Sequence, residues 1–530
     1  MRNPIDAIVE YVNPIAGVRR AQARVVTQIL ASGYSEGGAS RKKTAFKGWN
    51  WKGGSPKEDI EEPLEILRQR SRDLYMNGPL GRAAINRIQT NVVGSGLALR
   101  ATPDADALGL ETEEASQWAR AVEREWRLWA DSSECDHIGL STFDELQQVA
   151  LISWLASGDV FALLPMDLDS GEPYDLRVHL IEADRICNPP NIPRGMTVRQ
   201  GVEIDSQGRV RAYHIRSGHP LGPSYGQTSD AKWKRLPVWG EETRRRTVLH
   251  LMCAERPDQY RGVPILAPVI EQCKQLTRYA EAELMGAVVA SLFTVFIKSS
   301  TPETPFAEAF SDEQPAEKSL SEDPEAGYQY ALGSGAIVGL SPDEDIATAS
   351  PTRPNVQFDA FVTSVTSEIG AAINVPSELL MLRFTSSYSA SRAALLEAWK
   401  AFRMWRSWMS RDFCHPVYVE WLTEAVLRGR VQAPGFLQDP LLAWAWSRAQ
   451  WHGPAPGQVD PLKEVQAAVV RVGQGFSSRS RETSELTGGD YETNVRQLAE
   501  EERRRREAGM SIPDDDSGAT EPTAGQDGGA

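Results

Sequence analysis

The sequence predicts an α+β fold in which helices precede a mostly antiparallel sheet and helices return after it. Apolar residues first recur at helical spacing over residues 64–88, 115–131 and 142–155. Beyond Gly158 the period changes to two, which is typical of strands. Helical spacing resumes after Gly262. A chain of 530 residues with 41% hydrophobic residues can bury cores for two to four domains.

Local signals mark the ends of the first helices. Gly78-Pro79 divides the first segment into two helices, because both residues interrupt a helical pattern. Ser141 or Thr142 is placed to cap the helix that follows, with Glu145 nearby for a capping box. The helix before that one carries an apolar stripe of Trp118, Val122, Trp126 and Trp129.

The alternating segments after Gly158 are predicted to be strands, and Asp205 to Gly208 is predicted to form the turn between the last two of them. These strands are residues 160–165, 176–181, 201–204 and 210–215.

The most informative stretch is residues 255–298. The Gly262 and Pro264 break is followed by one long helical segment to about Ser291, and then by strand-like residues. An acidic, proline-rich insert separates this segment from a second helical one that begins near Asn355 and is ended by Pro376. A long helix, a small acidic module and a second helix that runs back beside the first form a hairpin. This arrangement suits a subunit that contributes two helices to a ring. The second helix has an apolar face of Phe358, Phe361, Val365, Ile369 and Ile373.

A loop of residues 381–388 follows, and Ser389 is predicted to cap another long helix. That helix carries Leu395, Trp399, Phe402, Trp405 or Arg406, and Met409 at helical spacing. An aromatic stripe of this spacing is typical of a core or a subunit interface rather than of a platform for stacking bases.

Charge is distributed unevenly around a net value of −15. Residues 1–57 hold ten Lys and Arg against three acids, which predicts a basic mobile arm. Residues 299–350 hold eleven acids against Lys318, and residues 507–530 hold six acids and no base. The acidic balance excludes a sequence-wide nucleic-acid clamp. The longest uncharged run, residues 284–297, is shorter than the ~20 residues that a membrane span needs.

Signatures of catalysis and cofactor binding are absent from the sequence. It contains no phosphate-binding GxxxxGK[ST], no HExxH and no GxSxG. The five cysteines form no CxxC pair, and the seven histidines never pair at helical spacing. These observations predict no enzyme, no cofactor and no metal site. The acidic run Asp343-Glu344-Asp345 is predicted to be solvated, because it lacks the alternating ligands of a calcium loop.

Five stretches carry a resemblance that extends over nearly the whole chain: RQRSRDLYMNGPLGRAAINRIQTNVVGSGL (68–97), EADRICNPP (182–190), TVLHLMCAERPDQYRGVPILAPVI (247–270), SSYSASRAALLEAW (386–399) and VDPLKEVQAAVVRVGQGFSSRSRETSELTGGDYE (459–492). On these residues the chain resembles the lambda-like portal proteins of tailed phages. The resemblance implies a dodecameric ring at one capsid vertex, with wing, stem, clip and crown regions and an axial channel for DNA. It also implies that the packaging ATPase is a separate terminase.

The resemblance implies a portal-protein fold with a helical and mixed-sheet wing, a two-helix stem, a small α/β clip and a helical crown side. In chain order these are a basic flexible arm (1–62), the wing (63–262), the first stem helix (263–291), the acidic clip (292–354), the second stem helix (355–379), the tunnel loop (380–390), wing and crown helices (391–505) and a disordered acidic tail (506–530).

Site residues follow from that layout. The tunnel loop that faces DNA is expected to present Arg383, Phe384, Thr385 and Ser386. The stem interface between subunits is expected to use Leu266, Ile270, Leu284, Val288, Phe361 and Val365. The acidic clip residues are Glu303, Asp312, Glu313, Glu322, Asp323, Asp343, Glu344 and Asp345.

Residue chemistry leaves alternatives open at two of these sites. The clip acids either repel a sliding duplex or are solvated on the outer side of a ring. Phe384 either projects toward DNA or tucks into the core of a plain helix–helix connection.

The resemblance also implies partners: further copies of the chain, double-stranded DNA, terminase, major capsid and scaffold proteins, and head-completion or tail-joining proteins. It implies a place in the virion, with the host cytoplasm as the site of assembly and no membrane. A different head–tail connector is the first alternative, which the helix–clip–helix order disfavours. A head-maturation hydrolase is the second, for which no Ser/Lys or Ser/His arrangement stands out.

Overall fold

The computed structural model describes residues 53–168, 171–220, 232–291, 295–299, 344–348, 357–385, 387–457 and 461–510, together with residues 15 and 44. The chain separates into two units, Met1–Asp59 and Ile60–Ala530. All of the packing below lies in the second unit. The predicted basic arm and the acidic tail fall largely outside the described residues.

Helices open the second unit, as the sequence predicts. They are α3 (Leu64–Asn77), α4 (Pro79–Val92), the short α5 (Ala105–Leu108), α6 (Thr112–Ala130) and α7 (Phe143–Ser157). Thr142 caps α7 and forms the predicted capping box with Glu145. Gly81 lets α4 approach α3 closely, since a Cβ there would lie 2.6 Å from the carbonyl oxygen of Leu74.

The strands that follow are antiparallel in every named pair, in agreement with the predicted period of two. In one sheet β2 (Asp159–Leu163) lies between β3 (His179–Ile181) and β8 (Val248–Met252). A second sheet has the order β4 (Thr197–Arg199), β5 (Val202–Ile204), β6 (Val210–Arg216) and β7 (Trp233–Pro237).

The turn of residues 205–208 joins β5 to β6 as predicted, and the Asp205 carboxylate accepts hydrogen bonds from the backbone N–H groups of Gln207 and Arg209. The strand predicted over residues 176–181 is shorter, because its ladder to β2 begins at His179.

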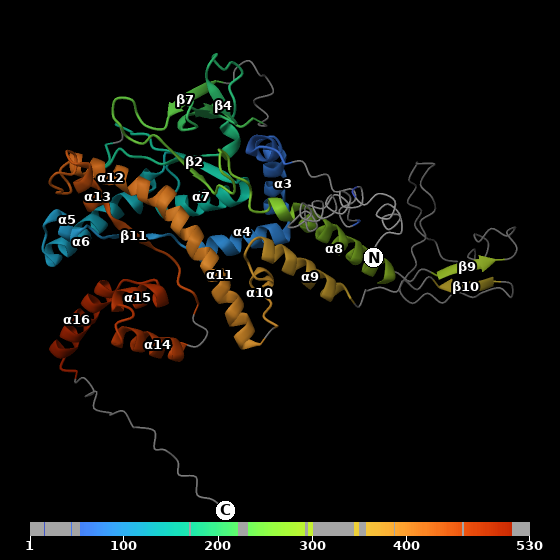
Figure 1. The fold of residues 1–530 in the computed structure, drawn as a ribbon. Helices are drawn as coiled ribbons and strands as arrows, with labels where there is room; N and C mark the ends of the chain where they lie inside the picture. Colours follow the sequence, from blue (N-terminus) through green and yellow to red (C-terminus); the bar gives the residue numbers. More distant parts are fainter. Residues whose placement is uncertain are drawn as a thin grey trace, which may run out of the picture. The chain divides into compact units, whose positions relative to one another are not determined.

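The two helices predicted on either side of the acidic insert are both present (Figure 1). A 3-10 turn at Ala267–Val269 leads into α8 (Ile270–Ser291), and α9 (Phe358–Ala372) returns beside it. Between them β9 (Val295–Ser299) pairs with β10 (Glu344–Thr348). Helix α9 ends before Pro376, as the sequence predicts, and Asn374 adopts a left-handed φ of 56° there. The region 355–379 assigned to the second stem helix therefore also holds the start of a separate helix, α10 (Ser377–Met381).

The next helix, α11 (Tyr388–Met409), begins two residues before the predicted start, with Ser387 rather than Ser389 at its N-cap. It continues through a π-helical turn at Ser410–Cys414 into α12 (His415–Leu427), and α13 (Pro440–Ser447) follows. Strand β11 (Ala449–His452) then pairs with β1 (Ala98–Ala101), an early strand that the sequence did not predict. The last helices are α14 (Pro461–Gly473), α15 (Arg479–Thr487) and α16 (Tyr491–Glu507).

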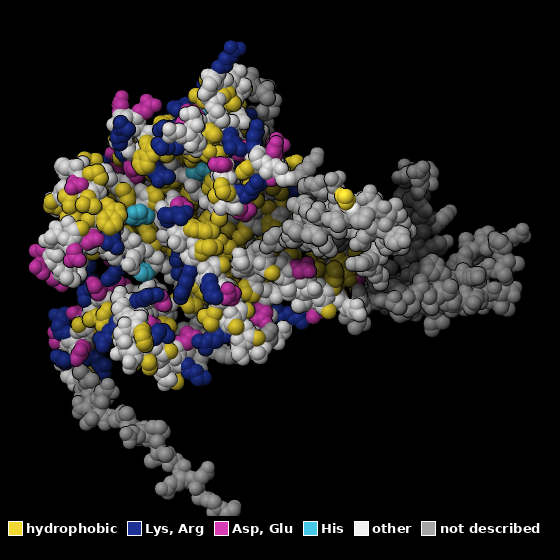
Figure 2. Space-filling view, viewed as in Figure 1, with side chains coloured by type: hydrophobic (Ala, Val, Ile, Leu, Met, Phe, Trp, Pro, Cys, Tyr) yellow, Lys and Arg dark blue, Asp and Glu magenta, His cyan; other side chains and the backbone are white. Residues whose placement is uncertain are grey.

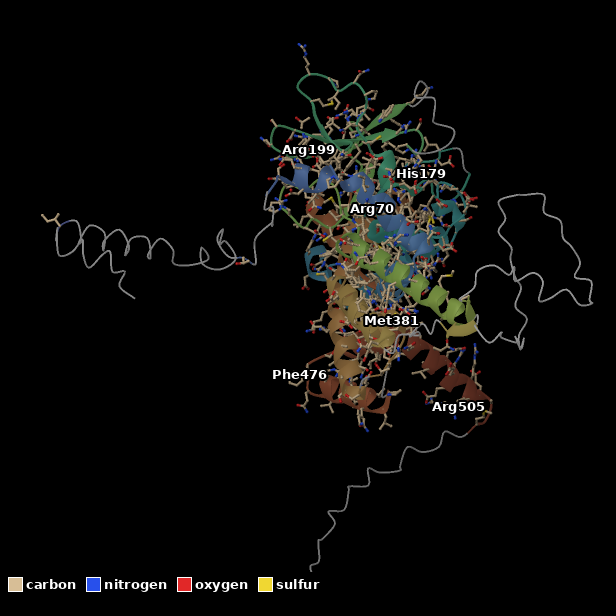
Figure 3. The ribbon with its side chains drawn as sticks, turned by 90° about the vertical axis from the view of Figure 1, so that its right-hand side faces the viewer. Arg70, His179, Arg199, Met381, Phe476 and Arg505 are labelled. Carbon is tan, nitrogen blue, oxygen red and sulfur yellow. The ribbon has the colours of Figure 1, made fainter. Side chains whose placement is uncertain are left out.

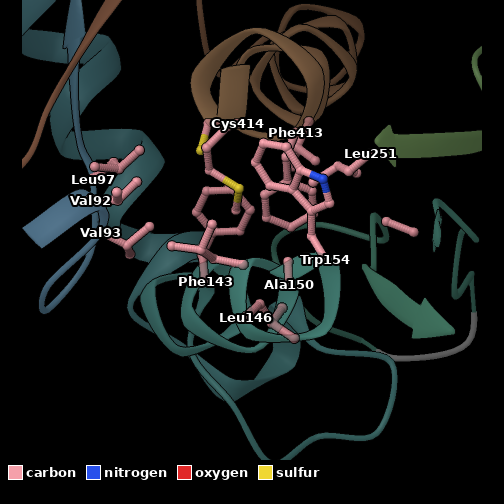
Figure 4. Close-up of a cluster of buried hydrophobic side chains, with 14 of the residues drawn as sticks. Val92, Val93, Leu97, Phe143, Leu146, Ala150, Trp154, Leu251, Phe413 and Cys414 are labelled. Carbon is pink, nitrogen blue, oxygen red and sulfur yellow. The ribbon is translucent and has the colours of Figure 1, made fainter. Parts of the chain in front are cut away.

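One core joins the early and late parts of this unit. Phe143 and Trp154 of α7 point toward Phe413 and Cys414 (Figure 4), and Leu146 belongs to the same core. Trp126 of α6 has ring contacts at 5.1–6.0 Å with Tyr418, Trp421 and Trp451. The aromatic stripe of α11 also enters this core through Trp399, Phe402, Trp405 and Met409. Both stripes therefore serve packing.

Candidate functional site

The helix α8 starts from a buried charge cluster, here named the stem root. Its centre is Asp159 at the start of β2, which is fully buried. The Asp159 carboxylate accepts hydrogen bonds from Arg261 Nε (2.6 Å), Arg68 Nη2 (2.8 Å) and the backbone N–H of Gly262 (3.1 Å). His250 Nε2 of β8 lies 3.3 Å from the same carboxylate. The segment just before α8 is thus attached to both α3 and the three-stranded sheet.

Burial and charge oppose one another in the stem root. Burial alone raises the pKa of Asp159, but the Arg261 and Arg68 guanidiniums override it and hold that pKa well below its usual range. Burial, with Arg261 close by, lowers the pKa of Arg68 to about 10. Burial also lowers the pKa of His250. The cluster therefore keeps an ionised Asp159 between two arginines and a histidine that resists protonation.

Arg261 also satisfies three backbone carbonyl groups in two other segments. Its Nη atoms donate to the carbonyl oxygens of Ala183 (2.7 Å), Ile186 (2.8 Å) and Gln200 (2.5 Å). Next to it Gly262 crosses Gly158 so closely that a Cβ on Gly262 would lie 1.9 Å from the Gly158 carbonyl oxygen. Only glycine fits that crossing, so the backbone path into α8 is fixed.

The two helices α8 and α9 pack on each other through aromatic residues and leave apolar side chains uncovered. The Tyr279 ring lies 5.5 Å from Phe358 and 5.1 Å from Phe361. Of the predicted interface residues, Leu284 is 66% exposed, and Phe361 and Val288 are about half exposed. Ile270 and Val365 are half-buried. Leu266 is fully buried in the chain's own core, so it offers no surface to a second subunit, and its place in the predicted interface is corrected.

The predicted tunnel loop is shorter than residues 380–390. Helix α10 ends at Met381, labelled in Figure 3, and α11 begins at Tyr388. Leu382 follows α10 in the left-handed region with φ 51°. The loop between α10 and α11 is therefore residues 382–387, of which Ser386 lies outside the described residues. Thr385 is exposed in this loop.

Arg383 in this loop forms an ion pair with the same chain. Its Nη1 lies 2.5 Å from Asp359 Oδ1 in the first turn of α9, and its Nη2 donates to Oδ2 at 3.4 Å. The hydrogen bond with Asp359 raises the pKa of Arg383. Sequence reasoning missed Asp359, because nothing in the local pattern links positions 24 residues apart.

Phe384 points neither wholly outward nor into the core. It is 53% exposed and lies on the edge of a groove of about 820 Å³ between α11 and the C-terminal helices α14 and α15. Leu395, Leu396 and Trp399 of α11 line that groove. The loop thus contacts the start of α9 through Arg383 and borders the groove through Phe384.

Most of the predicted clip acids lie outside the described residues: Glu303, Asp312, Glu313, Glu322, Asp323 and Asp343. Glu344 and Asp345 begin β10, where Asp345 stands opposite Lys298 in the ladder with β9.

In the described part of the chain, few other features indicate a metal, membrane or nucleic-acid site. No group of three or more His, Cys, Asp or Glu is placed there to hold a metal ion. None of the described helices is long and apolar enough to cross a membrane. On the face seen in Figure 2, Lys and Arg side chains are interspersed with Asp and Glu. That mixed surface differs from the basic patch of a static DNA-binding protein.

Residues 42–406 match the family model described as phage portal protein, lambda family. Portal protein B of Escherichia phage lambda is 26% identical over 502 residues, which cover 91% of each chain. The portal protein of Escherichia phage N15 is 26% identical over 498 residues, or 91% of this chain and 92% of that one. Among solved structures, the neck of a native gene transfer agent (GTA) particle computed with C12 symmetry covers 78% of this chain and 92% of the matched chain, at 15% identity and a TM-score of 0.41.

Proposed function

Because the chain belongs to the lambda family of phage portal proteins, we propose that its copies close into a dodecameric ring at one capsid vertex. That ring is the conduit through which double-stranded DNA is packaged and later ejected. The match over residues 42–406 carries the proposal, since it contains the stem root, both helices α8 and α9, and the loop between α10 and α11. We assign the chain no catalytic activity.

The helices α8 and α9 supply the inter-subunit contact of the proposed stem. Leu284, Val288 and Phe361 leave apolar surface uncovered on a pair of helices too narrow to bury it alone. In a ring each pair packs against the next by the same rotation, which covers that surface without leaving a free end. Ile270 and Val365 extend the same contact toward the body.

The loop of residues 382–387 is the element that meets DNA in this proposal. Arg383 is paired with Asp359, so the loop presents a neutral ion pair rather than a bare cation. Each fixed cation adds affinity for phosphates and therefore friction to a duplex that must slide. Exchange of Arg383 between Asp359 and a passing phosphate allows a brief contact in each subunit.

The remaining partners follow from a place at the vertex. Terminase and, later, head-completion or tail-joining proteins dock on the clip, where the acids of residues 299–350 gather. Major capsid and scaffold proteins surround the ring. We propose that the chain assembles in the host cytoplasm and ends in the virion.

Electron microscopy of the purified full chain tests the ring directly. We expect closed rings with a central hole, and a mass by light scattering that is a multiple of 58.5 kDa. Ring size can vary when scaffold is absent. A monodisperse monomer at micromolar concentration and moderate salt would contradict the proposal.

A further inference from the structure

The helix α14 is amphipathic in the opposite sense to an ordinary surface helix. Its exposed face carries Leu462 and Val465, then Val469 and Val472 at alternating spacings of three and four, and Phe476 continues the series just beyond the helix. This is the spacing of a helix seam that packs against another helix. Leu462 is 69% and Phe476 is 80% exposed. Val472 is half-buried.

The side of α14 that meets the body is instead charged or small. Glu464 pairs with Arg392 of α11 at 3.4 Å, and Arg471 makes a two-pronged bond with Glu482 of α15 at 2.6 and 2.9 Å. Ala468 is the buried residue of the helix. Surface helices normally bury their apolar stripe and expose the polar one. These polar contacts therefore fix α14 in the orientation that leaves its apolar stripe uncovered.

The C-terminal end of α14 also leaves an apolar side chain, that of Phe476, exposed. Gly475 has a left-handed φ of 73°, its N–H donates to Val472 O, and the N–H of Phe476 donates to Arg471 O. This is the Schellman pattern of a helix C-terminus, in which the residue at the position of Phe476 commonly packs back on the last turn. Phe476 stays exposed despite that defined position.

A second apolar face belongs to the same group of helices. Val495 and Leu498 of α16 are exposed and share one face with the half-buried Tyr491. The start of α16 is held to the body by ion pairs, with Asp490 bound to Arg100 and Glu492 to Arg100 and Arg120. In Figure 3, Phe476 after α14 and Arg505 of α16 lie on opposite sides of the C-terminal helices.

We propose that the apolar stripe Leu462–Phe476 packs against the Val495 and Leu498 face of α16 in a neighbouring copy of the chain. The inference rests on the ring of the proposed function. Copies in a cyclic ring are related by rotation alone, so a contact joins parts at the same level along the axis. A contact that repeats around a closed ring also joins two different faces of each subunit. The faces of α14 and α16 lie on two different helices of the chain, as a contact that repeats around a closed ring requires.

Charge substitutions test whether the stripe holds the ring together. The variant Val465→Glu/Val469→Glu of the full chain places two carboxylates against Val495 and Leu498 in the proposed contact, where the loss of water is costly. We expect loss of rings by electron microscopy and light scattering at concentrations where the unaltered chain is assembled. Gln466→Glu, exposed on the same helix, is the matched control and should leave the rings unchanged. Circular dichroism and the melting temperature establish that each variant is folded.

Cysteine cross-linking tests the partner face. The variant Val469→Cys/Leu498→Cys should give, after oxidation, a ladder of cross-linked species up to the full ring on a non-reducing gel. Either single variant should match the unaltered chain. Rings without a ladder would overturn the α14–α16 contact, and dimers from Val469→Cys alone would replace it by contact between two α14 helices.

The two proposals fail in different ways. Absence of rings from the unaltered chain would contradict the proposed function and the inference together. Normal rings of Val465→Glu/Val469→Glu would overturn the inference alone. Such rings with poor incorporation into capsids would assign the stripe to a different protein.

Discussion

The stem root and the loop between α10 and α11 each hold an arginine bound to an aspartate, in opposite environments. Arg261 and Asp159 are both fully buried, whereas Arg383 and Asp359 are 56% and 68% exposed. The buried pair is supplemented by Arg68, His250 and three backbone carbonyls. The exposed pair has water as the alternative partner of both groups. The same ion pair therefore fixes the start of α8 in one place and remains exchangeable in the other.

Removing the arginine from each pair is expected to give the largest difference in folding stability between the stem root and the loop. Arg261→Met leaves Asp159 buried with Arg68 as its remaining cation and frees three carbonyls, so we expect a loss of about 3–5 kcal/mol in stability. Arg383→Met is the matched control and should leave the melting temperature nearly unchanged, because the pair is solvated. Thermal melting of both full-length variants measures the contrast. Equal melting temperatures would show that burial does not distinguish the pairs.

The next largest effect on stability is expected where Gly262, beside Arg261, crosses Gly158. Gly262→Ala places a Cβ against the Gly158 carbonyl, which neither backbone can avoid without shifting, so we expect a loss of about 1–3 kcal/mol and fewer closed rings. Gly457→Ala is the control, because a Cβ there meets no atom within 4 Å. Melting curves and ring counts by electron microscopy give the readout. A Gly262→Ala chain that melts with the unaltered one would mean that the crossing tolerates a side chain.

Acidification should weaken the stem root. The folded pKa of His250 is lowered, so the unfolded chain takes up a proton first, and stability falls as pH drops below about 6.5. The slope reaches about 1.4 kcal/mol per pH unit for one proton. The folded pKa of Asp159 is also lowered, so its contribution is present above about pH 4 and is lost below that.

Melting temperatures between pH 7.5 and 5 report on His250 together with His179, His415 and His452, whose pKa values burial also lowers. His250→Gln should make the decline over this interval shallower, whatever its effect on stability at pH 7.5, because it removes one of the four histidines whose pKa burial lowers. His415→Gln is the matched comparison, because burial also lowers the pKa of His415, which lies outside the stem root. An unchanged slope for His250→Gln would assign the decline to other groups.

Local signals were enough to predict much of this fold. The Thr142 and Glu145 capping box and the Asp205 turn lie within a few residues of the elements that they define. The helices α8 and α9 were predicted from helical spacing on either side of an acidic insert. The start of α11 was missed by two residues, since Ser387 and Ser389 are equally good caps and only the folded backbone decides between them.

Contacts between distant segments were not predictable in the same way. Strand β1 pairs with β11 about 350 residues later, and Asp159 finds Arg68 and Arg261 across 91 and 102 residues. Neither arrangement leaves a local pattern. Leu266 shows the related limit of an apolar stripe, which indicates that a face will be covered but does not say whether its own chain or a neighbour covers it.

Reversing the charge of Arg383 is expected to have the smallest effect on stability. It is also the sharpest test of whether Arg383 exchanges between Asp359 and a passing phosphate. Arg383→Glu faces Asp359 with a like charge, which should change the melting temperature little and leave rings intact, because both groups are solvated. We expect it to impair DNA packaging or retention in a complementation assay, since the loop then repels phosphates. The swap Arg383→Glu/Asp359→Arg restores the pair but moves the cation to α9. If the loop needs the cation itself, the swap remains defective; if the pair alone matters, packaging returns. Full-length DNA in normal yield from Arg383→Glu would remove Arg383 from the channel, and failed rings would place it in a subunit contact.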